Sequence, residues 1–361
     1  MSINEIIIYI MAAFMVLGAV DRITGNRFGL GEKFEEGILA MGSLALSMIG
    51  IIVLAPVLSD LLRPVVVPLF NLVGADPAVF AGTVLANDMG GAPLAMELAQ
   101  SKEAGQFGGL IVGAMLGPTV VFTIPVALGI IKAEDRPALA RGVLAGIITV
   151  PIGSFAGGLA AGFSVLMVLR NLIPIVLIAI LIAVGLLLVP NGMVKGFQVF
   201  GRIIIILITV GLAAAIIDAL TGIPVIPGLT SPEEGFQTVG SIAIVLAGAF
   251  PLVHVITKVF RKPLLKLGGL LGMNDKAAAG MVATLANNIP MFGMLHEMDE
   301  RGKVINVAFA VSAAFVFGDH LGFTAGFDET MIFPMIVGKL VGGVTAVAVA
   351  LFLTRKEKKE R

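Results

Sequence analysis

The stretch that decides the fold is TVLANDMGGAP, residues 83–93, in the middle of an apolar segment. It places an aspartate, two glycines and a proline where an uninterrupted transmembrane helix would be apolar throughout. A carboxylate at the centre of a bilayer costs roughly 3 kcal/mol on insertion scales, so it needs a partner, water or a ligand. The glycines and the proline favour a break in the helix at this point.

The composition predicts an all-α polytopic membrane protein. Apolar residues make up 58% of the chain and charged residues only 13%, about half the share usual in a soluble domain. Uncharged stretches are long enough to cross roughly 30 Å of hydrocarbon, whereas a transmembrane barrel would show short alternating segments. Lysine and arginine balance the acids at 24 each, and no basic arm indicates nucleic acid as a partner. The lipid bilayer is therefore the expected surrounding.

Catalytic and metal-binding motifs are not found in the sequence. The chain has no cysteine, and its three histidines do not have the spacing of metal ligands. HExxH, GxSxG and P-loop motifs are absent as well. We therefore predict a protein that is not an enzyme and that has no cofactor and no metal.

The chain resembles itself at an offset of about 200 residues. VLAND at 84–88 matches TLANN at 284–288, and GPTVVFT at 117–123 aligns with GDHLGFT at 318–324. Further matches fall in the same order along the chain, which indicates a duplication. The alternative explanation is the shared composition of membrane segments.

The distribution of basic residues favours two re-entrant hairpins. If all eleven apolar segments crossed the membrane, lysine and arginine would be divided almost evenly between the two faces. If 77–98 and 277–298 instead enter and return on one side, twenty basic residues share one face and three the other. This predicts nine crossing helices plus two hairpins, with the N-terminus outside and the C-terminus cytoplasmic. The two repeats are then inverted. Eleven crossing helices remain the alternative.

The expected organisation follows from this topology. Residues 1–161 form the first repeat, 162–191 a linking span, 192–354 the second repeat and 355–361 a cytoplasmic tail. A short amphipathic stretch precedes each hairpin, at 61–74 and 259–272, and fits either an interfacial helix or a loop. The residues suited to turning the hairpins are Gly90, Gly91, Pro93, Pro290 and Gly293.

Polar residues at corresponding depths of the two halves predict a site between the repeats. Two acids and one histidine in an apolar wall favour a small organic cation or a proton as the ligand. The candidate residues are Asn87, Asp88, Thr119, Thr123, Asn287, Asn288, Asp319 and His320.

Several strings closely resemble the EutH-type ethanolamine permeases of bacterial ethanolamine-utilization operons. Among them are LANDMGGAPLAMELA at 85–99, GPTVVFTIPVALGII at 117–131 and RGKVINVAFAVSAAFVFGDHLGF at 301–323. The likeness covers nearly the whole chain. It implies a bacterial inner-membrane protein that admits ethanolamine, which cytoplasmic ammonia-lyase enzymes then degrade.

The chemistry of ethanolamine assigns roles to the candidate residues. Asp88 or Asp319 would pair with the ammonium, and Asn287, Asn288, Thr119 and Thr123 would hold the hydroxyl. Cation–π contacts would come from Phe122, Phe292 and Phe323.

Structural roles compete with these assignments. Asp88 could serve only as a helix cap, and Asp319 and His320 could form an internally satisfied pair. Lys339 could extend toward the interface or neutralise a buried acid, and a pairing with Asp319 would weaken that acid as a ligand.

The expected mechanism is alternating access through a midplane site. A passive ethanolamine channel and a carrier of another small organic cation are the alternatives. His320 beside Asp319 suggests proton coupling. The sequence leaves coupling and oligomeric state open.

Overall fold

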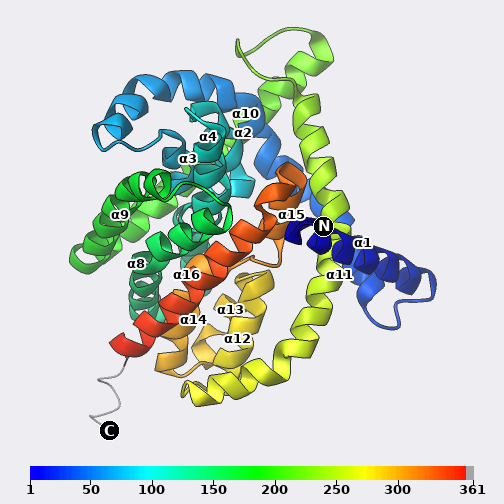
Figure 1. Cartoon of the computed structure of the whole chain (residues 1–361), viewed down its shortest axis with the longest axis vertical. Coiled ribbons are helices and arrows are strands. Elements are labelled where there is room, and N and C mark those ends of the chain that lie inside the picture. Colours follow the sequence, from blue (N-terminus) through cyan, green and yellow to red (C-terminus); the bar gives the residue numbers. More distant parts are fainter. Residues whose placement is uncertain (355–361) are drawn as a thin grey trace.

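The computed structural model describes residues 1–354, without the side chains of 190, 191, 194, 260, 261, 264 and 267. Within this range every regular element is a helix, which confirms the predicted all-α class (Figure 1). Helices satisfy their backbone N–H and C=O groups within one segment, so they suit an apolar surrounding. The tail expected at 355–361 lies outside the described residues.

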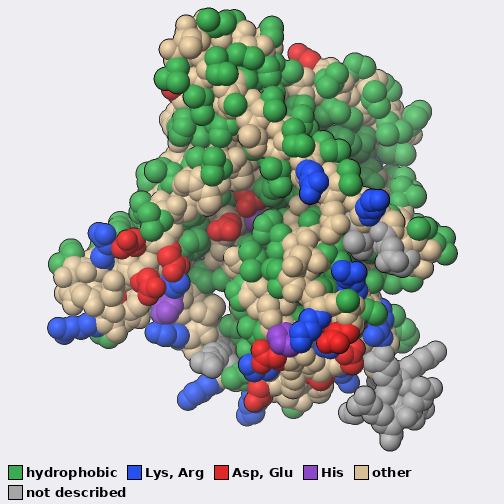
Figure 2. All heavy atoms as spheres, turned by 180° about the vertical axis from the view of Figure 1, so that it is seen from behind, with side chains coloured by type: hydrophobic (Ala, Val, Ile, Leu, Met, Phe, Trp, Pro, Cys, Tyr) green, Lys and Arg blue, Asp and Glu red, His purple; other side chains and the backbone are tan. Residues whose placement is uncertain are grey.

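Seven helices in the described part of the chain are long and apolar enough to cross a membrane, so this is a multi-pass membrane protein. They are α1 (Ile3–Ile23), α2 (Leu30–Leu72), α8 (Arg136–Ala160), α9 (Val165–Leu188), α10 (Pro190–Thr221), α11 (Pro232–Leu270) and α16 (Ile332–Leu353). Figure 2 shows hydrophobic side chains over most of one face, with charged side chains gathered toward the end where α16 finishes.

An eighth candidate span is a bent pair of helices, Lys102–Ala114 and Leu116–Ile130, with an angle of 41° between them. It contains α5 (Lys102–Gln106), π-helical turns at Phe107–Ile111 and Thr119–Thr123, α6 (Leu116–Pro118) and α7 (Ile124–Ile130). The nine crossing helices that we predicted therefore become seven continuous helices in the described residues, or eight with this pair. Proline and glycine in the segment account for the irregular turns.

The remaining predicted span, residues 304–323, is interrupted. It consists of α14 (Glu300–Ala313) and α15 (Asp319–Phe327). Between them Phe315 adopts a left-handed conformation with φ of 64°. The backbone N–H groups of Phe315 and Phe317 donate to the carbonyls of Thr284 and Leu285, at 3.1 and 2.9 Å. The second hairpin thus satisfies the backbone groups that the break sets free.

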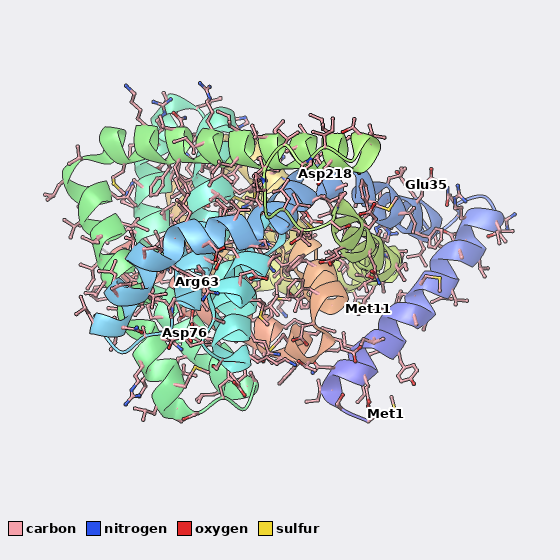
Figure 3. The ribbon with its side chains drawn as sticks, turned by 90° about the horizontal axis from the view of Figure 1, so that it is seen from above. Met1, Met11, Glu35, Arg63, Asp76 and Asp218 are labelled. Carbon is pink, nitrogen blue, oxygen red and sulfur yellow. The ribbon has the colours of Figure 1, made fainter. Side chains whose placement is uncertain are left out.

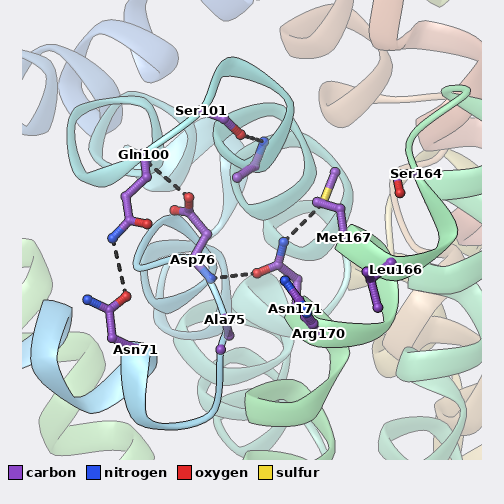
Figure 4. A pocket seen from close by; sticks show the side chains of 12 residues that line it. Asn71, Ala75, Asp76, Gln100, Ser101, Ser164, Leu166, Met167, Arg170 and Asn171 are labelled. Atoms are coloured by element: carbon purple, nitrogen blue, oxygen red, sulfur yellow. Dashed lines mark hydrogen bonds between the residues drawn. The ribbon is translucent and has the colours of Figure 1, made fainter.

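The segments 77–98 and 277–298 fold back on themselves. The first contains α3 (Ala78–Val84), a 3-10 turn (Asn87–Met89) and α4 (Gly91–Leu98), and the second contains α12 (Asp275–Ala286), α13 (Ile289–Gly293) and a 3-10 turn (Leu295–Glu297). The Asp76 carboxylate accepts the N–H of Gln100 at 3.0 Å, so the two ends of the first segment meet (Figure 4). Asn274 Nδ2 donates to the Glu297 carbonyl at 2.9 Å and joins the ends of the second.

Two acids at these hairpin ends lie outside the spans and have shifted pKa values. Burial raises the pKa of Asp76 above its ordinary value, although the N–H groups of Ala78 and Gln100 oppose the shift. The hydrogen bond from Lys276 lowers the pKa of Glu297, and the charge of that lysine adds to the effect.

The amphipathic stretches at 61–74 and 259–272 are neither separate helices nor loops. Residues 61–72 and 259–270 continue α2 and α11 without interruption, past the internal prolines 64, 68 and 263. Continuation keeps nearly all backbone groups bonded within one helix, which an apolar surrounding requires.

Glycines let the long helices pack backbone to backbone. A Cβ on Gly50 of α2 would overlap the carbonyl of Ile208 in α10, and one on Gly248 of α11 would overlap that of Met11 in α1. Small residues at interfaces allow this close approach in membrane proteins. The helices α2 and α11 also pack along each other, as do α8 and α16, whereas α1 projects at the edge of the molecule (Figure 3).

Candidate functional site

The two hairpins turn at corresponding points of the sequence and leave polar side chains inside the protein. In the first, α3 ends before the extended residue Leu85, and the following 3-10 turn carries Asn87 and Asp88. In the second, Asn287 is extended, and its Oδ1 accepts the N–H of Ile289 at 2.8 Å. Non-helical backbone at such depth is tolerated only where it is buried in protein or lines a cavity.

The partly buried Asp88 and the buried His320 and Lys339 form a row of ionisable groups from three different elements. Asp88 Oδ1 lies 3.9 Å from His320 Nε2, and His320 Nδ1 lies 3.0 Å from Lys339 Nζ. Lys339 also donates to the carbonyl of Ala114. Because a lysine ammonium can only donate, a charged Lys339 makes Nδ1 the acceptor and leaves the ring proton on Nε2, facing Asp88.

Of the two behaviours that the sequence suggested for Lys339, extension to the interface is wrong, whereas the lysine does interact electrostatically with one acid inside the protein, Asp88. The lysine side chain is 1% exposed, so it does not extend to the interface. Its recorded partners are His320 and the Ala114 carbonyl rather than Asp319. A buried ammonium in a membrane protein is costly and marks a functional position.

Asp319 lines a cavity of about 610 Å³. The walls come from α2, α11, the second hairpin and the residues just before α15. Lys33 and Glu36, which are partly exposed, pair at 2.6 Å and also line the cavity. Asp319 also interacts electrostatically with Asp88, so the two acids lie near each other. In Figure 2 acidic side chains lie in a depression near the middle of the face shown.

The two predicted threonines already have hydrogen-bond partners within the protein. Asn288 Nδ2 donates to Thr123 Oγ1 at 3.1 Å, which links the tip of the second hairpin to the bent pair. Thr119 Oγ1 lies 2.9 Å from the Met115 carbonyl and 3.1 Å from that of Val311. The only proton of the Thr119 hydroxyl is therefore used within the protein.

Several buried polar atoms near the hairpin tips have no hydrogen-bond partner among the described residues. They are both amide atoms of Asn87, Asn288 Oδ1 and the hydroxyls of Thr284 and Thr324. Buried polar groups in native proteins are almost always paired, so each such group needs an explanation. Water or a polar ligand would supply the missing partners.

The predicted aromatic residues occupy different environments. Phe122 packs edge to face on Phe315 at 5.7 Å, and the Phe315 ring lies 5.2 Å from that of His320. Phe292 and Phe323 are fully buried, and Phe323 stacks on Phe327 at 5.3 Å. None of the three predicted residues is among the described residues that line the large cavity.

Of the five predicted hinge residues, Gly90 has the most specific conformation. Its φ of 88° is left-handed, and Gly91 follows as the first residue of α4. Pro93 and Pro290 lie in the first turns of α4 and α13, where a proline costs little. Gly293 ends α13, and a Cβ there would meet no atom within 4 Å.

The sequence did not indicate two aromatic residues of the large cavity, Phe250 and Phe317. Phe317 lies two residues before Asp319, and the irregular backbone there turns it toward the cavity. Phe250 belongs to a different helix, α11, so no local pattern connects it with the hairpin tip.

Among the described residues, no group of three or more His, Cys, Asp or Glu side chains could hold a metal ion. The polar groups of the central site are carboxylates, one histidine, one lysine and side-chain amides.

Comparison with known proteins gives a consistent result over the whole chain. The "Probable ethanolamine permease EutH" of Listeria monocytogenes is 66% identical over 100% of this chain and 96% of its own length. The protein of the same name from Escherichia coli is 53% identical, over 99% of this chain and 97% of its own. The Salmonella typhimurium protein is 52% identical over the same shares. No solved structure matches.

The sequence profile of one family matches residues 3–353, which is nearly the whole chain. Permeases are transporters rather than enzymes, in agreement with the prediction from the motifs. The chain belongs to the family described as ethanolamine utilisation protein, EutH.

Proposed function

We propose that the protein is an ethanolamine permease that imports protonated ethanolamine across the bacterial inner membrane by alternating access. Three relatives that share 52% to 66% of its residues are named probable ethanolamine permeases. Ethanolamine is mostly protonated at neutral pH and carries one ammonium and one hydroxyl. It therefore needs one counter-charge and a few hydrogen-bonding groups from the protein.

The observation that carries the proposal is the grouping of two carboxylates and one lysine around His320: Asp319 precedes it in the chain, Asp88 lies 3.9 Å from its Nε2 and Lys339 lies 3.0 Å from its Nδ1. Asp88 interacts electrostatically with both Asp319 and Lys339. With all three ionised, this set has a net charge of −1, which one monovalent cation neutralises. Uncompensated charge inside a membrane protein is costly, so the set suits a single small organic cation. Asp88 or Asp319 pairs with the ammonium in this proposal.

The unpaired polar groups at the hairpin tips support a place for the hydroxyl. The amide of Asn87 and Oδ1 of Asn288 have no partner within the described chain, and Asn287 lines the cavity. Phe250 and Phe317 supply the aromatic walls, because Phe292 and Phe323 pack in the core. A desolvated cation–π contact contributes about 2 kcal/mol.

We also propose that residues 1–161 and 192–354 are inverted repeats joined by the span 162–191. Matching contacts support this relation. A Cβ on Gly117 would overlap the carbonyl of Leu85, and one on Gly318 would overlap that of Ala286. The contacts of Gly50 and Gly248 described above correspond in the same way. Transporters with inverted repeats place their substrate site at the repeat interface.

The orientation in this proposal has the N-terminus outside and the C-terminus in the cytoplasm. The ends of the first hairpin then lie outside, and those of the second lie inside. Excess lysine and arginine on the cytoplasmic side supports this orientation. The large cavity, which carries Lys33 and Lys258, then faces inward.

The test is uptake of labelled ethanolamine into proteoliposomes, with protein-free liposomes to correct for free base that crosses the lipid. We expect Asp88→Asn to lose at least about tenfold of the wild-type rate, because a carboxylate–ammonium pair is a charge-assisted bond. Glu134→Gln, which changes an exposed carboxylate outside the site, should transport like the wild type. Wild-type uptake by a correctly folded Asp88→Asn protein would make Asp88 a structural cap.

Exchange kinetics separate a carrier from a channel. A carrier gives saturable uptake that internal ethanolamine accelerates, whereas a channel gives no such acceleration. A wild-type response to an imposed pH gradient would add proton coupling, for which His320 is the candidate group.

A further inference from the structure

A second, smaller cavity of about 230 Å³ lies between α2, α4 and α11. Its walls include Ile52, Ala55 and Pro56 from α2, Glu97 from α4 and Glu234 from α11. It is therefore lined by the first hairpin, as the large cavity is lined by the second.

The two cavities are lined by corresponding positions of the two halves. Four positions recur at a constant separation of 198 residues: 52 and 250, 55 and 253, 56 and 254, and 36 and 234. In each pair one residue lines the small cavity and the other lines the large one. The same separation relates Gly50 and Gly248, whose backbone contacts also correspond.

We infer that the small cavity is the outer mouth of the substrate path, closed in this structure, and that the large cavity is the inner mouth, open. This inference rests on the proposed transport function, because it assigns the two mouths to one path. Corresponding residues of inverted repeats form both mouths, and rearrangement of the repeats exchanges their sizes. The ligand that passes is a small organic ammonium.

The charges that line the two cavities differ in a way that suits a cation entering from outside. Among the described residues, Glu97 and Glu234 are the only charged groups that line the small cavity. Both signs line the large one, with Lys33, Glu36, Lys258 and Asp319. A mouth that carries a single sign of charge raises the local concentration of the opposite ion.

Hydrogen bonds hold the outer mouth closed. Ser59 Oγ of α2 donates to the carbonyl of Glu97 at 3.4 Å, and Arg63 Nη2 donates to the same carbonyl. Arg63 Nε also donates to Ser59 Oγ at 3.1 Å. We call these three residues the outer clasp, because they attach the end of α4 to α2. Figure 3 shows Arg63 on α2, beside the first hairpin.

The corresponding groups at the inner mouth bond within their own elements. Thr257, which is 198 residues after Ser59, donates to the His254 carbonyl of its own helix at 2.9 Å. The Glu297 carbonyl accepts from Asn274, at the start of its own hairpin. The small cavity therefore lies where the outer clasp joins α4 to α2. The large cavity lies where Thr257 and the Glu297 carbonyl bond within their own elements.

Cysteine labelling tests the inference, because the chain contains no cysteine of its own. The matched variants are Ala55→Cys and Val253→Cys, one at each mouth. The probe is 2-(trimethylammonium)ethyl methanethiosulfonate, a membrane-impermeant organic cation, applied to right-side-out and inside-out vesicles. We expect Val253→Cys to react from inside, and Ala55→Cys to react at least about tenfold more slowly from outside.

Adding Arg63→Gln should accelerate outside labelling of Ala55→Cys by about tenfold and slow inside labelling of Val253→Cys. Lys102→Cys, which is exposed beside the first hairpin, should keep its rate and controls for reagent access. Ser59→Ala serves as a second clasp variant if Arg63→Gln does not fold. Unchanged labelling of Ala55→Cys after removal of the clasp, or faster labelling of it from inside, would overturn the inference.

Adding ethanolamine separates this inference from the proposed function. If removal of the clasp exchanges the two rates but ethanolamine alters neither, the path is supported and its assignment to ethanolamine fails. If ethanolamine protects Val253→Cys but removal of the clasp changes nothing, the transported ion is supported and the outer mouth is wrong.

Discussion

Gly90 is the residue at which the first hairpin turns. Its φ of 88° is left-handed, and a Cβ on it would overlap the side chain of Ile51 in α2. Left-handed backbone costs an L-residue roughly 1–2 kcal/mol, and overpacking of a core adds roughly 1–3 kcal/mol. We therefore expect Gly90→Ala to lower the free energy of unfolding by about 2–4 kcal/mol, measured by denaturant titration in detergent.

Gly293→Ala is the matched control at the second hairpin. A Cβ there meets no atom within 4 Å, so the change should stay within about 0.5 kcal/mol. Adding Ile51→Ala to Gly90→Ala should remove the overpacking but not the backbone cost. Equal stability of the two glycine variants would show that the first turn tolerates a side chain.

Asp88 and His320 could be proposed for one site from the sequence, but their distance and the contact of His320 with Lys339 could not. An aspartate within an apolar segment is visible in any hydropathy profile, and it implies a partner. His320 and Lys339 lie more than 230 residues away along the chain, on α15 and α16. Asp88 lies 3.9 Å from His320, which in turn lies 3.0 Å from Lys339, and packing of α15 against the first hairpin brings these groups together.

If the first hairpin is re-entrant, the residues before and after it lie on the same side of the membrane. Asn71 and Lys102 flank the first hairpin, and both are exposed. A segment that returns leaves both flanks on one side, whereas a crossing helix separates them. We expect Asn71→Cys and Lys102→Cys to react with an impermeant maleimide from outside the cell only.

Lys276→Cys and Glu300→Cys flank the second hairpin and should react from the cytoplasmic face only. These two variants also control for reagent leakage, since they should stay unlabelled in intact cells. Labelling of Asn71 and Lys102 from opposite faces would favour eleven crossing helices and remove the inverted relation.

Element boundaries were predicted less well than element positions. The hydrophobic cores of α2 and α11 were found, but both helices continue through residues that the sequence suggested were separate. Internal prolines are compatible with a membrane helix when neighbouring groups satisfy the freed carbonyl. Local pattern cannot show whether such neighbours exist.

The distribution of lysine and arginine over the whole molecule predicts which face of the protein lies in the cytoplasm. Tags at the two termini should differ in protease access. We expect an N-terminal tag to be cleaved in right-side-out vesicles and a C-terminal tag only in inside-out vesicles, because basic residues are retained in the cytoplasm. Cleavage of the C-terminal tag from outside would reverse the assignment of the inner and outer mouths.

The sequence by itself determined the helical class, the membrane location and the repeated sequence pattern. These properties depend on composition and spacing, which act locally. Only the tertiary structure decided that Lys339 contacts His320, that Phe250 and Phe317 line the large cavity and that the two cavities differ in size. Such properties depend on contacts between helices distant in the chain, and packing against those helices selects them.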